Sequence, residues 1–79
     1  MNESFPKEVE ARVREACVKN SRVIEHIYSF LSHELGKESV QDILELSKED
    51  QTEACLNHLR IGVEVGDIQL KDIEALITT

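Results

Sequence analysis

Residues Ser21–Leu35, SRVIEHIYSFLSHEL, decide the fold, because they carry two apolar stripes at helical spacing. The main stripe has the spacing of a helix that faces its own protein's core, and it consists of Ile24, Ile27, Tyr28, Leu31 and Leu35. A second stripe, on the flank and back of the same helix, consists of Val23, His26, Phe30 and His33. A helix in a small monomer needs one stripe only. The second stripe therefore predicts either a surface for a partner or a helix packed centrally between others.

The flanking segments are also periodic, and breakers are scarce, with three glycines and one proline in the chain. We therefore predict an all-α fold, a compact bundle of about four to five short helices in one domain over residues 1–79. A chain this short buries only about 60% of its unfolded surface, so homodimerisation could complete its core. The other helices are predicted over Pro6–Val18, Ser39–Leu46, Ser47–Val65 and, from near Asp67–Gln69, to Ile77.

Residues that favour helix ends mark several of these boundaries. Ser4, Ser21 and Ser47 are predicted N-caps, because a serine hydroxyl accepts a hydrogen bond from a free N–H in the first turn. Gly36 and Gly66 follow predicted helix ends, where glycine adopts a positive φ without strain.

The main stripe of the Ser47–Val65 helix consists of Thr52, Leu56, Leu59 and Val63. The end of this helix is apolar nearly all round, because Ala54, Ile61 and Val65 add apolar groups on the far side. This end is therefore predicted to be buried centrally or to sit at an interface. Alternation of Ile61, Val63 and Val65 leaves a second interpretation open, in which residues 61–70 form a short β-hairpin.

The charge of the chain narrows the range of partners. The net charge is −7, and most of the excess negative charge lies in the second half of the chain. Five basic and six acidic residues precede Gly36, whereas four basic and ten acidic residues follow it. Such a chain repels phosphate backbones and anionic membranes, so we expect no direct nucleic-acid binding and no membrane association. No segment resembles a signal peptide or a membrane span, which favours a cytoplasmic location.

A cluster of acidic residues spans the third and fourth predicted helices. Its members are Asp42, Glu45, Glu49, Asp50 and Glu53. Such a cluster is often a solvated face, but it can also dock a basic protein surface or imitate a nucleic-acid backbone.

The cysteines and histidines allow one metal hypothesis. Cys55 and His58 have the spacing of half a zinc site, and Cys17, His26 and His33 could supply the rest. Their spacing matches no compact ligand pattern, however, so we expect buried reduced thiols, surface histidines and no cofactor. The chain also lacks a phosphate-binding loop, a dinucleotide fingerprint and a His-Glu zinc motif, which argues against an enzyme.

The sequence therefore predicts a non-enzymatic, acidic helical protein that binds another protein, as a regulator, inhibitor, chaperone or adaptor. The predicted partner has a basic or mixed apolar surface, and a second copy of the chain is another candidate. The alternatives are an acidic mimic of nucleic acid that blocks a DNA- or RNA-binding protein and, third, a metal-binding helical protein. The predicted contact residues are the second stripe and the acidic cluster.

Overall fold

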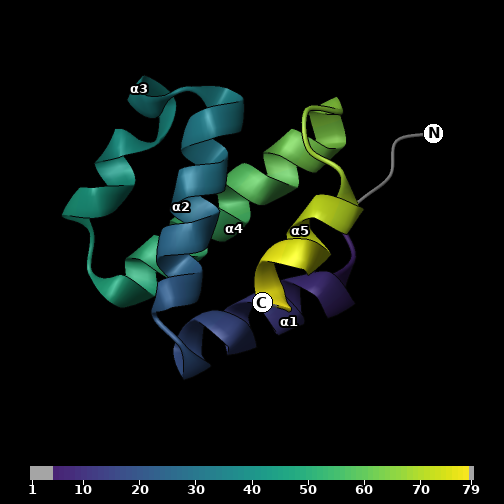
Figure 1. Cartoon of the computed structure of the whole chain (residues 1–79), viewed down its shortest axis with the longest axis horizontal. Helices are drawn as coiled ribbons and strands as arrows, with labels where there is room; N and C mark the ends of the chain where they lie inside the picture. The colour runs from purple at the N-terminus through teal and green to yellow at the C-terminus, as the bar shows by residue number, and fades with distance from the viewer. Residues whose placement is uncertain (1–4, 79) are drawn as a thin grey trace.

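The computed structural model describes residues 5–78, and within them it contains helices and no strand (Figure 1). The all-α prediction is thus confirmed. The elements are α1 (Lys7–Lys19), α2 (Arg22–Leu35), α3 (Lys37–Val40), the 3-10 helix η1 (Gln41–Glu45), α4 (Lys48–Val65) and α5 (Leu70–Ile77). The predicted helix over Ser39–Leu46 is instead divided into the short α3 and η1.

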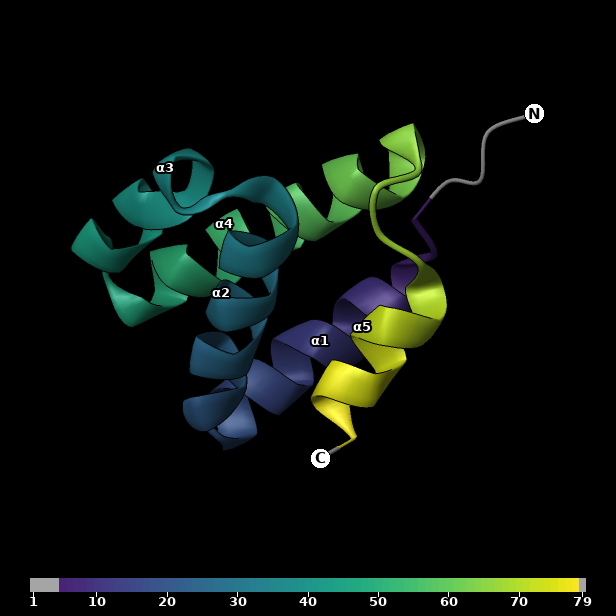
Figure 2. The same cartoon turned by 45° about the horizontal axis from the view of Figure 1, so that its top comes forward.

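Helix α2 is the centre of the bundle, because it contacts α1, α3, α4 and α5. It crosses in front of the long α4, while α5 lies beside α1 (Figures 1 and 2). Its main stripe points inward as predicted: Ile24, Ile27 and Leu31 are buried. Tyr28 and Leu35 pack against the edge of the same core.

The core is one continuous aliphatic cluster to which every α-helix contributes. Its most enclosed large side chains are Ile27, Leu31, Leu56, Leu59 and Ile73. Phe5 belongs to this cluster and is the only buried aromatic residue among those described. None of the helices within residues 5–78 is both long enough and apolar enough to cross a bilayer.

The helix ends confirm one predicted N-cap and correct another. Ser47 accepts a hydrogen bond on Oγ from the Asp50 N–H at 3.3 Å, which caps α4. Ser21 makes no such bond, because its backbone is already helical (φ −61°, ψ −18°). Asn20 caps α2 instead, since its Oδ1 accepts from the Arg22 N–H at 3.0 Å. Ser4 lies outside the described residues.

Helix α4 continues to Val65, so the hairpin interpretation of residues 61–70 is wrong. Gly66 ends the helix in the left-handed conformation (φ 89°), and the N–H groups of Asp67 and Ile68 both bond to the Gly62 carbonyl. The chain then folds back and places the Ile68 side chain on Gly62, where a Cβ atom would lie 2.8 Å from Ile68 Cγ1. A glycine at this position therefore allows the reversal that leads into α5.

The apolar end of α4 is not buried centrally within the chain. Ile61 and Val65 are 58% and 64% exposed, which excludes the first of the two predicted placements and leaves the second, at an interface, as a prediction. No other helix of the described chain covers them, since α5 returns along α1 and α2 instead.

Candidate protein-binding surfaces

The second stripe of α2 does not form one continuous outer surface. Val23, predicted on the flank of the helix, is instead buried at 5% exposure. It lines a small groove with Ala16 of α1 and Ile77 of α5, two helices that both contact α2. Helix α2 is packed on both sides, and Val23 belongs to the protein's own core.

The middle of the stripe lines a groove between α2 and α5. His26, which is exposed, and Phe30, which is half-buried, form one side of a groove of about 410 Å³. Asp72, Ala75 and Leu76 of α5 form the other side. We call this the α2–α5 groove.

His33, at the end of the stripe, points into solvent. Its side chain is 84% exposed, and Nε2 lies 3.9 Å from the Glu34 carboxylate. Two of the four residues of the stripe, His26 and Phe30, therefore line one groove. Val23 is buried, and His33 is exposed outside the groove.

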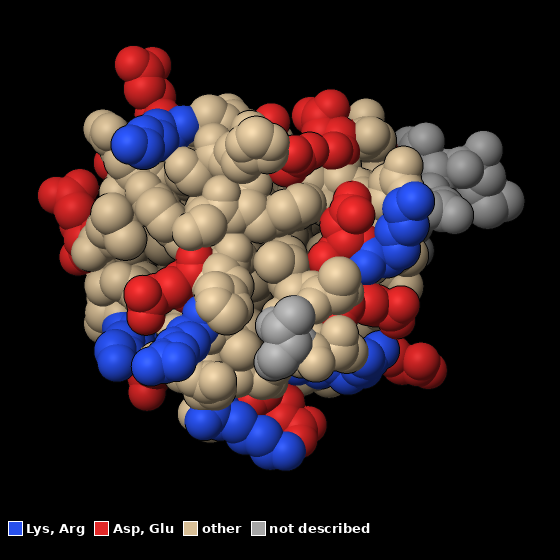
Figure 3. All heavy atoms as spheres, viewed as in Figure 1, with Lys and Arg blue, Asp and Glu red and all other residues tan. Residues whose placement is uncertain are grey.

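The surface around the α2–α5 groove carries little charge. Figure 3 shows a broad uncharged area over α2 and between α2 and α5, with lysine, arginine and acidic side chains gathered toward its margins. Because charged residues make up 32% of the chain, such an area is a departure from the rest of the surface.

A second and larger groove lies between α1 and the first half of α4, with a volume of about 760 Å³. Three members of the acidic cluster line it: Glu49, Asp50 and Glu53. Its apolar lining comes from Cys17, Val18 and Ile24. We call this the α1–α4 groove. Asp42 and Glu45 are exposed on η1 and do not line it, so the predicted cluster is divided between two places.

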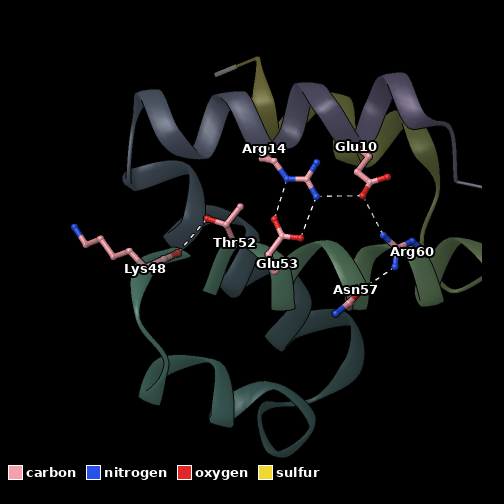
Figure 4. Close-up of polar contacts among 7 residues, drawn as sticks. All are labelled: Glu10, Arg14, Lys48, Thr52, Glu53, Asn57 and Arg60. Atoms are coloured by element: carbon pink, nitrogen blue, oxygen red, sulfur yellow. Dashed lines mark hydrogen bonds and ion pairs between the residues drawn. The ribbon is translucent and has the colours of Figure 1, made fainter. Parts of the chain in front are cut away.

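Glu53 is held within the molecule by a cross-helix ion pair. Its two carboxylate oxygens accept from Arg14 Nε at 2.8 Å and from Arg14 NH2 at 3.0 Å. These hydrogen bonds lower the pKa of Glu53. Glu10 extends the network, because its Oε1 lies 3.2 Å from both Arg14 and Arg60, as Figure 4 shows. Glu53 therefore joins α1 to α4 and is not a free acid.

Both cysteines of the chain lie in its core. Cys17 and Cys55 are buried thiols, and burial raises the pKa of both, that of Cys55 to about 12. A thiol with so high a pKa is protonated near neutral pH. Within residues 5–78, no group of three or more His, Cys, Asp or Glu side chains is arranged to hold a metal ion.

The sequence did not single out the residues that complete the two grooves. Ala75, Leu76 and Asp72 could not be matched to Phe30 before it was known that α5 folds back onto α2. Val18 did carry a signal, since it is an apolar residue outside the core stripe of its own helix.

No protein-family model, no curated protein and no solved structure matches this chain.

Proposed function

We propose that this protein is a non-enzymatic binding domain that docks another protein in the α2–α5 groove. The observation that carries the proposal is Phe30, a half-buried aromatic side chain that lines an open groove together with Ala75 and Leu76. Aromatic anchors at the centre of an interface supply much of its binding energy, and such centres are depleted in charged residues. The protein would then act as a regulator, inhibitor, chaperone or adaptor.

The groove has the polarity of an interface centre. Ala75 and Leu76 supply apolar surface opposite Phe30, while His26 and Asp72 supply polar groups at its edge. A partner side chain placed here would lose water from apolar surface and still find hydrogen-bonding groups at the rim.

The net charge of the protein favours a partner with basic residues. Asp42, Glu45, Glu49 and Asp50 are exposed, and none of them takes part in an ion pair within the described chain. With a net charge of −7, the protein would attract a basic partner and speed its association. Two unpaired thiols suit the reducing cytoplasm as the site of action.

Ala75→Arg tests the proposal with little risk to the fold, because Ala75 is exposed and lines the groove. A matched control is Ala11→Arg, which makes the same change at an exposed site on α1, outside the groove. Wild-type protein and both variants would be immobilised, and host proteins captured on each compared by quantitative mass spectrometry. We expect a partner that Ala75→Arg loses and Ala11→Arg keeps. Equal capture by all three proteins would contradict the proposal.

Salt distinguishes apolar docking from imitation of a nucleic acid. Binding in the groove should persist when the salt concentration is raised, whereas the binding of a charge mimic should collapse. Sedimentation of the purified protein over a range of concentrations would show whether the occupant is a second copy of the chain. A dimer that Ala75→Arg dissociates would assign the groove to self-association.

A further inference from the structure

We propose that the α1–α4 groove is a second docking site, which takes a basic, amphipathic segment of a partner protein. It shares no lining residue with the α2–α5 groove, so this inference stands independently of the function proposed above.

The groove contains an apolar contact that the fold leaves uncovered. Val18 is 79% exposed, the most exposed of the large hydrophobic side chains described. It lies near the C-terminal end of α1, outside the buried stripe of Val9, Val13 and Cys17. Buried Ile24 and Cys17 line the groove beside it. An apolar side chain of a partner could therefore cover Val18 and reach an apolar floor.

Most of the positive charge in this groove is already neutralised. Arg14 is paired with Glu53 and Glu10, and Lys19 Nζ lies 2.9 Å from the Glu15 carboxylate. Among the groove's other charged side chains, Glu49 and Asp50 have no ion-pair partner in the described chain, and they outnumber the unpaired Lys48. The free charge of the groove is thus negative.

The charge decides the occupant. A second copy of the chain carries a net charge of −7 and would bring further carboxylates toward Glu49 and Asp50. A segment with an apolar residue next to lysine or arginine would satisfy both the apolar contact at Val18 and these two acids. The expected ligand is therefore a basic, amphipathic peptide.

Fluorescence polarisation with three labelled peptides of equal length would test this inference. The probe alternates leucine and lysine, a second peptide replaces leucine by serine, and a third replaces lysine by glutamate. We expect the leucine–lysine peptide to bind best. Val18→Ser should weaken its binding about tenfold, the loss expected for one buried valine contact. Glu49→Gln/Asp50→Asn should weaken it about fivefold.

A control pair removes two charges elsewhere on the molecule. Glu64→Gln/Asp67→Asn changes one exposed acid in the last turn of α4 and one just beyond the helix, and it should leave the affinity within about twofold. Because Glu49 and Asp50 also stabilise the first turn of α4, the melting temperature of each variant would first be compared with that of the wild type. Val18→Ser changes no residue of that turn. Amide chemical shifts would locate the bound peptide. Failure of the probe to bind, equal binding of the serine–lysine peptide, or an equal loss in the control pair would each overturn the proposal.

Discussion

Helices α2 and α4 both carry apolar residues on more than one side, yet the extra residues differ in their burial. On α2 the extra residue Val23 is buried, because α1 and α5 pack over that flank. On α4 the extra residues Ile61 and Val65 stay exposed, because no helix in residues 5–78 returns to cover them. The pattern within one helix therefore marks which side chains can be buried. The path of the other helices decides which of them are.

The same substitution on the two helices would test this difference most directly. Ile27 on α2 is fully buried, so Ile27→Ala should lower the free energy of unfolding by about 2–5 kcal/mol through lost apolar contact and a cavity. Ile61 on α4 is 58% exposed, and Ile61→Ala should change it by less than about 0.5 kcal/mol. Urea denaturation followed by circular dichroism measures both.

Protein concentration supplies the control for this pair. If Ile61→Ala destabilises the protein strongly, and more so at higher concentration, then a second copy covers the outer side of α4. Similar losses of stability for both variants at every concentration would contradict the assigned exposure of Ile61.

A second prediction concerns the turn that sends α5 toward α2 and away from the outer side of α4. Gly62→Ala should destabilise the protein by about 1–2 kcal/mol, because the new Cβ would overlap the Ile68 side chain. In an open helix the same change would stabilise by up to about 1 kcal/mol. Thermal unfolding of both single variants and of Gly62→Ala/Ile68→Ala measures the effect. The loss caused by Gly62→Ala should largely disappear when Ile68 is already alanine, and an undiminished loss would contradict the contact.

Periodicity within a helix was enough to predict the fold class and most of the core. The stripe of α4 illustrates this, since Thr52, Leu56, Leu59 and Val63 are all buried as predicted. These side chains lie at helical spacing, and any neighbour on that side would bury them. The exposure of Ile61 could not be predicted in this way, because it depends on the return of a helix that is distant in sequence.

The sequence could not show how the candidate site residues lie relative to one another, for two physical reasons. Val23 and Phe30 lie on the same stripe, but only the path of α5 determines that one is buried and the other lines a groove. Glu53 has the same local sequence character as Glu49, but its charge is taken up by Arg14, which lies 39 positions away in the sequence. Ion pairs between distant helices leave no trace in local sequence.

The N-termini of the two helices give a third prediction. Ser47→Ala should destabilise the protein by about 1 kcal/mol, because it removes the side-chain cap of α4. Ser21→Ala should have an effect below about 0.5 kcal/mol, because Ser21 makes no capping bond on α2. Asn20→Ala should resemble Ser47→Ala instead, since Asn20 caps α2. Chemical denaturation of the three variants would rank them, and a larger loss at Ser21 than at Asn20 would contradict the assigned cap.

The smallest expected effect concerns the ion pair that joins α4 to α1. Hydrogen bonds from Arg14 lower the pKa of Glu53 in the folded protein, so the charged carboxylate favours the folded state. This contribution is present above the ordinary glutamate pKa and is lost as the pH falls through the lower pKa of the folded state. Because both side chains are about half exposed, solvent weakens the pair, and Glu53→Gln should lower the melting temperature only slightly at pH 7. The difference in melting temperature between this variant and the wild type should shrink in acid.

Glu49→Gln is the control, because it changes an unpaired acid on the same helix. Its difference in melting temperature should not depend on pH through Arg14. A difference for Glu53→Gln that grows as the pH falls would contradict the pairing of Glu53 with Arg14.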